Sequence, residues 1–121
     1  MSAIGFESTL YARLDLYARS LDRVIIALKA DPGLASEDDW QRTTELIKTL
    51  TARRAPTLAA SAVAASLTQR LASDEGEWAQ IVAALEKRQG DREMLQRLDA
   101  LAWQLDEERT ATLARMRHNH A

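Results

Sequence analysis

The chain contains no cysteine among its 121 residues, and it has only four glycines and two prolines. The absence of cysteine excludes disulfide bonds and cysteine-ligated zinc sites. No apolar run approaches the roughly 20 residues that a membrane-spanning helix needs. The first residues also lack the basic start and the apolar stretch of a signal peptide. From these features we expect a cytoplasmic protein with no membrane partner and a core held together by packing alone.

Residues that favour β-strands are also scarce. Val and Ile together supply only eight positions, whereas Ala, Leu, Glu, Gln, Lys, Arg and Met supply 73. Unbranched side chains lose little rotamer freedom in a helix, and strands favour the β-branched and aromatic residues that this chain has little of. The composition therefore predicts an all-α fold.

The first half of the chain predicts two helices. Apolar residues recur at steps of four and three over 8–30, which indicates a long helix with one apolar stripe. Ser36 begins a second helix, with Asp39 in the closing position of a capping box. Pro56 must break or kink the chain, and the sequence leaves open whether two helices or one bent helix results.

The second half predicts three more helical segments. Small and apolar residues over 56–72 are typical of a helix that lies in the middle of a bundle. Ser73 caps a fourth helix, for which Gly90 is the expected left-handed stop. Asp91 then caps a long fifth helix that reaches about residue 117.

These segments predict one helical-bundle domain over 1–121. The connections are short, which favours antiparallel neighbours, and no linker is long enough to divide the chain. We therefore expect an all-α, single-domain bundle of about five antiparallel helices, with long first and last helices. The ends at 1–7 and 118–121 are expected to fray.

Residues that could carry chemistry are few. Both histidines, His118 and His120, lie in the last four residues, where a frayed end cannot hold the geometry of a general base. The glycines are isolated, so they form no phosphate-binding loop, and no Glu-x-x-His pair marks a di-iron site. Two of the three acidic clusters lie at helix starts, where carboxylates stabilise the helix dipole. We therefore expect no enzyme activity, no cofactor and no metal.

Positive charge is distributed unevenly along the chain. The segment 46–73 contains no acid, and the tail 109–121 carries a net charge of +3. Such cations can track nucleic-acid phosphates. The interpretation that we favour is that they pair with acids of 73–108 across the bundle. The candidate phosphate contacts are Lys48, Arg53, Arg54, Arg70, Arg109, Arg115 and Arg117.

Trp103 lies off the apolar stripe of its helix. On a helical wheel it is about 140° from the middle of that stripe, beside Asp99 and Asp106. Leu16 and Ile26 lie off the stripe of the first helix in the same way. Because tryptophan is enriched in interface hot spots, we expect these five residues to contact a partner. The alternative is that a layered bundle buries both faces internally.

The sequence therefore favours a non-enzymatic, helical protein–protein interaction module. Such a module would serve as an adaptor, a chaperone-like protein or a small structural subunit of a larger assembly. Its expected partner is another protein or a second copy of the chain, in a homodimer. The alternative function is an accessory subunit that binds the nucleic-acid backbone through 46–73 and the basic C-terminal tail.

Overall fold

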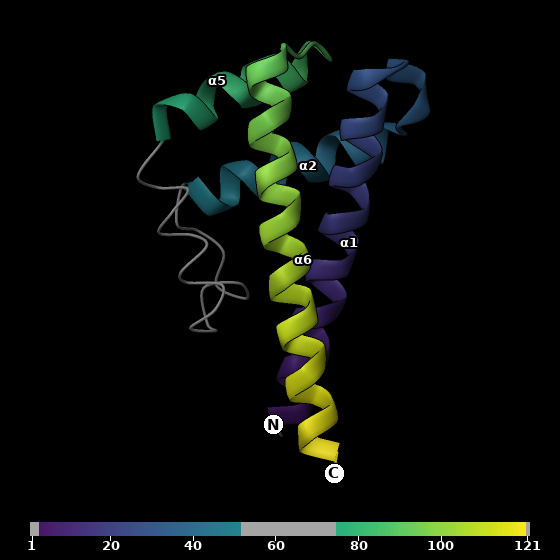
Figure 1. The fold of residues 1–121 in the computed structure, drawn as a ribbon, viewed down its shortest axis with the longest axis vertical. Coiled ribbons are helices and arrows are strands. Elements are labelled where there is room, and N and C mark those ends of the chain that lie inside the picture. Colours follow the sequence, from purple (N-terminus) through teal and green to yellow (C-terminus); the bar gives the residue numbers. More distant parts are fainter. Residues whose placement is uncertain (1–2, 52–74, 121) are drawn as a thin grey trace.

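The computed structural model describes residues 3–51 and 75–120 (Figure 1). These residues form α-helices, one short 3-10 helix and the connections between them, with no β-strand in the described ranges. The all-α expectation is confirmed. The expected helix over 56–72 and the break at Pro56 lie outside the described residues. The elements are α1 (Ala3–Lys29), the 3-10 turn η1 (Pro32–Leu34), α2 (Glu37–Thr51), α5 (Glu75–Glu86) and α6 (Arg92–His120).

The described helices form two layers. The long helices α1 and α6 lie side by side and run antiparallel, so that both chain ends lie at the same end of the molecule (Figure 1). Helix α2 crosses behind α6 in this view and packs on α1, and α5 packs mainly on α2. An antiparallel bundle of five helices is thus not confirmed. Only α1 and α6 are seen to follow this pattern, because the short η1 connection sends α2 across the long pair rather than along it.

The hydrophobic core lies between the two layers. The apolar stripe expected for the first helix is buried, and so is that of the last helix, which confirms the helical periodicity of both. The second layer contributes two tryptophans, Trp40 from α2 and Trp78 from α5. Full burial of one large apolar side chain contributes about 1.5–3 kcal/mol. The core includes Leu10, Leu14, Leu21, Val24, Ile47, Ile81, Leu85, Leu98, Leu101 and Leu105. Among the described helices, none combines the length and the apolar character that a bilayer span requires.

The start of α2 is held by the expected capping box. The backbone N–H of Asp39 donates to the Ser36 hydroxyl at 3.1 Å, and the Ser36 N–H donates to the Asp39 carboxylate at 3.0 Å. Asp39 is buried and also accepts a hydrogen bond from Arg23 of α1 at 3.2 Å. One carboxylate therefore caps α2 and ties it to α1.

The expected left-handed stop at Gly90 is wrong. The left-handed residue at the end of α5 is Arg88, with φ of 55°, whereas Gly90 has no positive φ. The turn is closed by N–H groups of Arg88 and Gln89, which donate to the carbonyls of Leu85 and Ala84 at 2.9 and 3.0 Å. A Cβ atom on Gly90 would lie 3.3 Å from a methyl carbon of Leu28. Glycine therefore serves close packing at this position and not backbone conformation.

Candidate functional site

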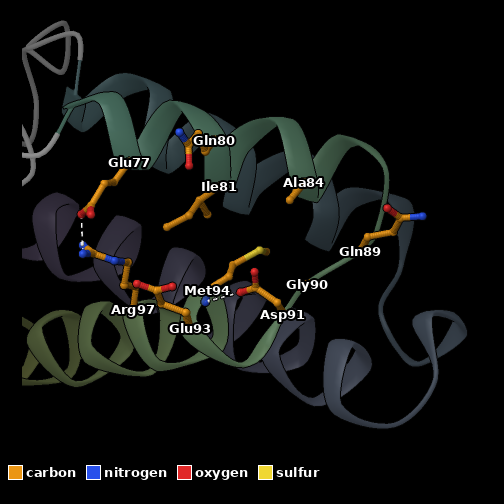
Figure 2. Close-up of a pocket in the computed structure, with 10 residues that line it drawn as sticks. All are labelled: Glu77, Gln80, Ile81, Ala84, Gln89, Gly90, Asp91, Glu93, Met94 and Arg97. Atoms are coloured by element: carbon orange, nitrogen blue, oxygen red, sulfur yellow. Dashed lines mark hydrogen bonds and ion pairs between the residues drawn. The ribbon is translucent and has the colours of Figure 1, made fainter.

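Three open grooves mark the described surface. The first, of about 450 Å³, lies between α5 and α6. Figure 2 shows that Glu77 on one wall reaches Arg97 on the other, and that Asp91 turns back to accept the N–H of Met94 at 2.8 Å. Within the described ranges no three His, Cys, Asp or Glu side chains gather as a metal site would need. The charged groups that line this groove thus hold α5 and α6 in place.

The second groove, of about 460 Å³, lies between α2 and α5. Lys48 crosses it to pair with Glu86 at 3.1 Å. Arg88 pairs with Glu37 and places its guanidinium carbon 5.5 Å above the centre of the Trp40 ring. This cation–π contact gives the left-handed Arg88 a packing role that glycine could not supply. The polar groups of this groove also hold the helices of the second layer together.

A further surface, which is not one of the grooves, is the side of α1 and α6 that faces away from α2 and α5. On α6, Trp103 lies roughly opposite the buried Leu101 and Leu105. On α1, Ile26 lies roughly opposite the buried Leu21. Since both helices bury their other side in the same core, their exposed sides form one surface. We call it the outer face and define it by eight exposed residues: Arg19, Asp22, Ile26, Lys29, Asp99, Trp103, Asp106 and Glu107.

Two ion pairs fix the register of α1 against α6 along the outer face. Lys29 pairs with Asp99 at 3.3 Å. Nearly four turns away along α1, Asp15 accepts a hydrogen bond from Arg109 at 2.9 Å, and Arg109 also pairs with Asp106. Because the helices are antiparallel, the midpoint between Asp99 and Arg109 on α6 lies level with the midpoint between Asp15 and Lys29 on α1. Trp103 is therefore level with the stretch of α1 around Asp22.

The charges on this surface are coupled across the two helices. Partial burial raises the pKa of Asp22 above its ordinary value; Arg109 lowers it, whereas Asp106 and Asp99 raise it further. Burial acts to lower the pKa of Arg109, but the hydrogen bonds that its guanidinium donates to Asp106 and Asp15 outweigh this effect, and the pKa is raised. Asp22 of α1 thus lies within electrostatic reach of Asp99, Asp106 and Arg109 of α6.

The structure brings together four of the five residues expected at a partner interface. Trp103 is 64% exposed and Ile26 is 55% exposed, and both share the outer face with Asp99 and Asp106. Leu16 is 46% exposed but lies elsewhere. Ten residues separate it from Ile26, which turns it by about 80° around α1. It lines a different groove, of about 540 Å³, with Ser8, Thr9, Ala12, Arg13 and Tyr17. A role for any of these residues in binding stays a prediction.

The expected phosphate contacts do not form one described patch. Lys48 pairs with Glu86, and Arg109 with Asp15 and Asp106. Arg115 donates to the Thr112 hydroxyl at 3.2 Å, and Arg117 is exposed near the end of α6. The Lys48–Glu86 pair is what the internal-pairing interpretation predicts. Arg109 instead pairs with Asp106 of its own helix and with Asp15, which lies outside 73–108. The remaining three candidates, Arg53, Arg54 and Arg70, lie outside the described residues.

Among the members of this surface that were not expected from the sequence are Asp22 and Lys29. A signal for them exists, because Asp15, Asp22 and Lys29 repeat every seven residues beside the apolar stripe of the first helix. That spacing places three charged groups along one edge of a helix. Their partners on α6 could be assigned only when the register between the two helices was known.

Comparisons of this chain with protein-family models, with curated proteins and with solved structures give no match. A function for this protein therefore rests on its own surface chemistry.

Proposed function

We propose that this chain is a non-enzymatic protein-interaction module and that the outer face, centred on Trp103, is its contact surface. The observation that carries the proposal is the 64% exposure of Trp103. Of the three tryptophans, Trp40 and Trp78 are buried, whereas Trp103 stands on the polar side of α6, where the fold itself makes little use of it. Tryptophan is among the residues that most often dominate protein interfaces.

The free energy available at Trp103 is large enough to matter. An aromatic side chain can bury up to about 250 Å², so a partner could cover on the order of 150 Å² of the exposed indole. At about 25 cal/mol per Å², this burial contributes at most ~4 kcal/mol before the entropic cost of association. Ile26, exposed on the neighbouring helix, adds a second apolar anchor to the same surface.

The charges around Trp103 favour a protein partner over nucleic acid. Its exposed charged neighbours one turn away on α6 are Asp99, Asp106 and Glu107, all of them acids. An aromatic platform for bases is normally bordered by cations that track the phosphates. Lys48 and Arg109, two of the cations expected to bind phosphate, pair with acids of the protein instead. Nucleic-acid binding thus has less support than protein contact.

Photo-crosslinking in the cells that make the protein tests the proposal. A benzophenone amino acid is placed at position 103 and, as a matched control, at the exposed Gln41 of α2 on the other layer. We expect protein adducts from position 103 in clear excess over those from position 41. Equal or absent adducts from position 103, in a variant whose circular dichroism is unchanged, would overturn the assignment of the outer face.

A further inference from the structure

We propose that the partner at the outer face is a second copy of this chain, packed so that α6 of each protomer lies over α1 of the other. This inference rests on the proposed function, because it names the occupant of the same surface. Three features carry it: the charges of the two helices are complementary, the exposed apolar residues lie at matching levels, and the area of the face suits a dimer.

The outer face divides into an acidic strip on α6 and a more basic strip on α1. Within one turn of Trp103 the exposed charged residues are three acids and no base. On α1 the outer face carries two bases, Arg19 and Lys29, and a single acid, Asp22. Arg19 pairs with Asp15 at 3.0 Å, yet its side chain stays 65% exposed and available to a second carboxylate. A surface of this kind attracts a copy of itself when the strips are exchanged.

A two-fold axis parallel to the long helices makes that exchange. The rotation brings the two outer faces together and places α6 over the partner's α1. The position of each residue along the helix axis does not change. Every contact then occurs twice, as in any isologous dimer. Because Trp103 is level with the region of Asp22 in its own protomer, it meets this stretch of the partner's α1, next to Ile26.

The same register brings a specific charged pair together. The Lys29–Asp99 and Asp15–Arg109 ion pairs define the level of each α6 residue on α1. Glu107, one turn past Trp103, falls level with Arg19, which lies two turns before Ile26 and on the same exposed side. In the dimer Glu107 of each protomer therefore faces the arginine at position 19 of the other.

The size of the outer face is adequate for a dimer. Helices of 27 and 29 residues rise about 1.5 Å per residue and are therefore roughly 40 Å long. Two such helices at an interaxial distance of about 8–10 Å present a strip about 20 Å wide. Over their full length the exposed sides of the two helices cover roughly 800 Å² per protomer, which is the area of a standard specific interface, and the outer face is the central part of this strip. With only Trp103 and Ile26 as apolar anchors, we expect association that depends on concentration.

Light scattering and sedimentation equilibrium of the purified chain measure this association. We expect a mass that rises toward twice the chain mass of 13.5 kDa as concentration increases. Trp103→Ala and Ile26→Ala should each weaken dimerisation at least tenfold while circular dichroism stays unchanged. Leu34→Ala is the matched control, because Leu34 is 57% exposed but belongs to η1, and it should leave the dimer unaffected. A parent chain that stays at 13.5 kDa up to about 1 mM, the weak limit of a specific contact, would overturn the inference.

A charge exchange tests the register. Arg19→Glu and Glu107→Arg each place like charges opposite one another twice per dimer, so each should weaken association about tenfold. The double variant restores both ion pairs with the two charges exchanged. It should recover the parent dissociation constant to within a few-fold. Glu45→Arg, at an exposed site on α2, controls for the change in net charge. Failure of the double variant to recover would refute the proposed packing.

The photo-crosslinking experiment separates failure of this inference from failure of the proposed function. A chain that is monomeric when pure, yet crosslinks from position 103 to a different protein, contradicts the second copy and leaves the interaction surface standing. A monomeric chain without crosslinks contradicts both. The expected result is a crosslinked product of twice the chain mass that forms from position 103 and is lost when Ile26→Ala is introduced into the same chain.

Discussion

Replacing Asp39 by alanine is expected to destabilise the fold far more than replacing its neighbour Asp38. The Asp39 carboxylate accepts the Ser36 N–H at 3.0 Å and the Arg23 guanidinium at 3.2 Å, and it is buried. Loss of a capping interaction costs about 1 kcal/mol. The Arg23 side chain is half-exposed, so solvent screens its ion pair to at most about 1 kcal/mol. Arg42 also pairs with this carboxylate, at 3.8 Å, and with all three interactions lost we expect a total of about 2–3 kcal/mol.

The effect is large enough to be measured by thermal unfolding. An unfolding entropy of about 2.1 cal/mol/K per residue predicts a fall in Tm of roughly 8–12 °C for this chain. Asp38→Ala is the control, because Asp38 is exposed on the same helical turn and only approaches Arg42, at 3.7 Å. That variant should lose less than about 0.5 kcal/mol. Equal melting temperatures for the two variants would refute the role of Asp39 at the junction of α1 and α2.

The same carboxylate predicts a dependence on pH. Burial acts to raise the pKa of Asp39, but the hydrogen bonds from Ser36 and Arg23 outweigh it and hold the pKa below its ordinary value of 3.8. A carboxyl whose pKa is lower in the folded than in the unfolded chain contributes its full stability above the unfolded pKa, and this contribution is lost as pH falls through the folded pKa. The stability difference between the parent and Asp39→Ala should therefore be full at neutral pH and shrink below about pH 4. Urea unfolding at neutral and at acidic pH measures this stability difference. A difference that grows in acid would contradict the stabilising role of the ionised Asp39 carboxylate.

Two further substitutions test local features of the fold. Thr43→Val should stabilise the protein by about 1 kcal/mol in urea unfolding, because the Thr43 hydroxyl is buried and has no hydrogen-bond partner among the residues that the structure describes. A destabilised variant would show that the hydroxyl is satisfied. Arg88→Gly should be more stable than Arg88→Ala by about 1 kcal/mol, because both lose the contacts with Trp40 and Glu37 but only glycine relieves the left-handed backbone. Thermal unfolding of both variants decides this point, and an alanine variant as stable as the glycine variant would refute it.

The candidate surface was only partly predictable from the sequence. The position of Trp103 opposite the apolar stripe could be predicted, because the wheel of a single helix depends on nothing outside that helix. The tertiary structure decided that this side is exposed, since a layered bundle could have buried it. The same logic grouped Leu16 with Ile26, because both residues lie off the apolar stripe of the first helix. The structure separates them, since a residue off the stripe can lie on either side of it. Asp22 and Lys29 were missed because their significance arises from contact with α6.

By itself, the sequence determined the helices that the structure describes, their buried sides and the capping box at Ser36. These features depend on residues three or four positions apart, within reach of one helical turn. Tertiary structure alone decided that α2 crosses the long helices, that Lys29 meets Asp99, and that the left-handed position falls on Arg88 rather than on Gly90. Arg88 takes up this strained conformation because Trp40 and Glu37 of another helix hold its side chain, and Gly90 is needed because Leu28 approaches it closely. Such features are set by the register between helices, which packing fixes and local spacing does not encode.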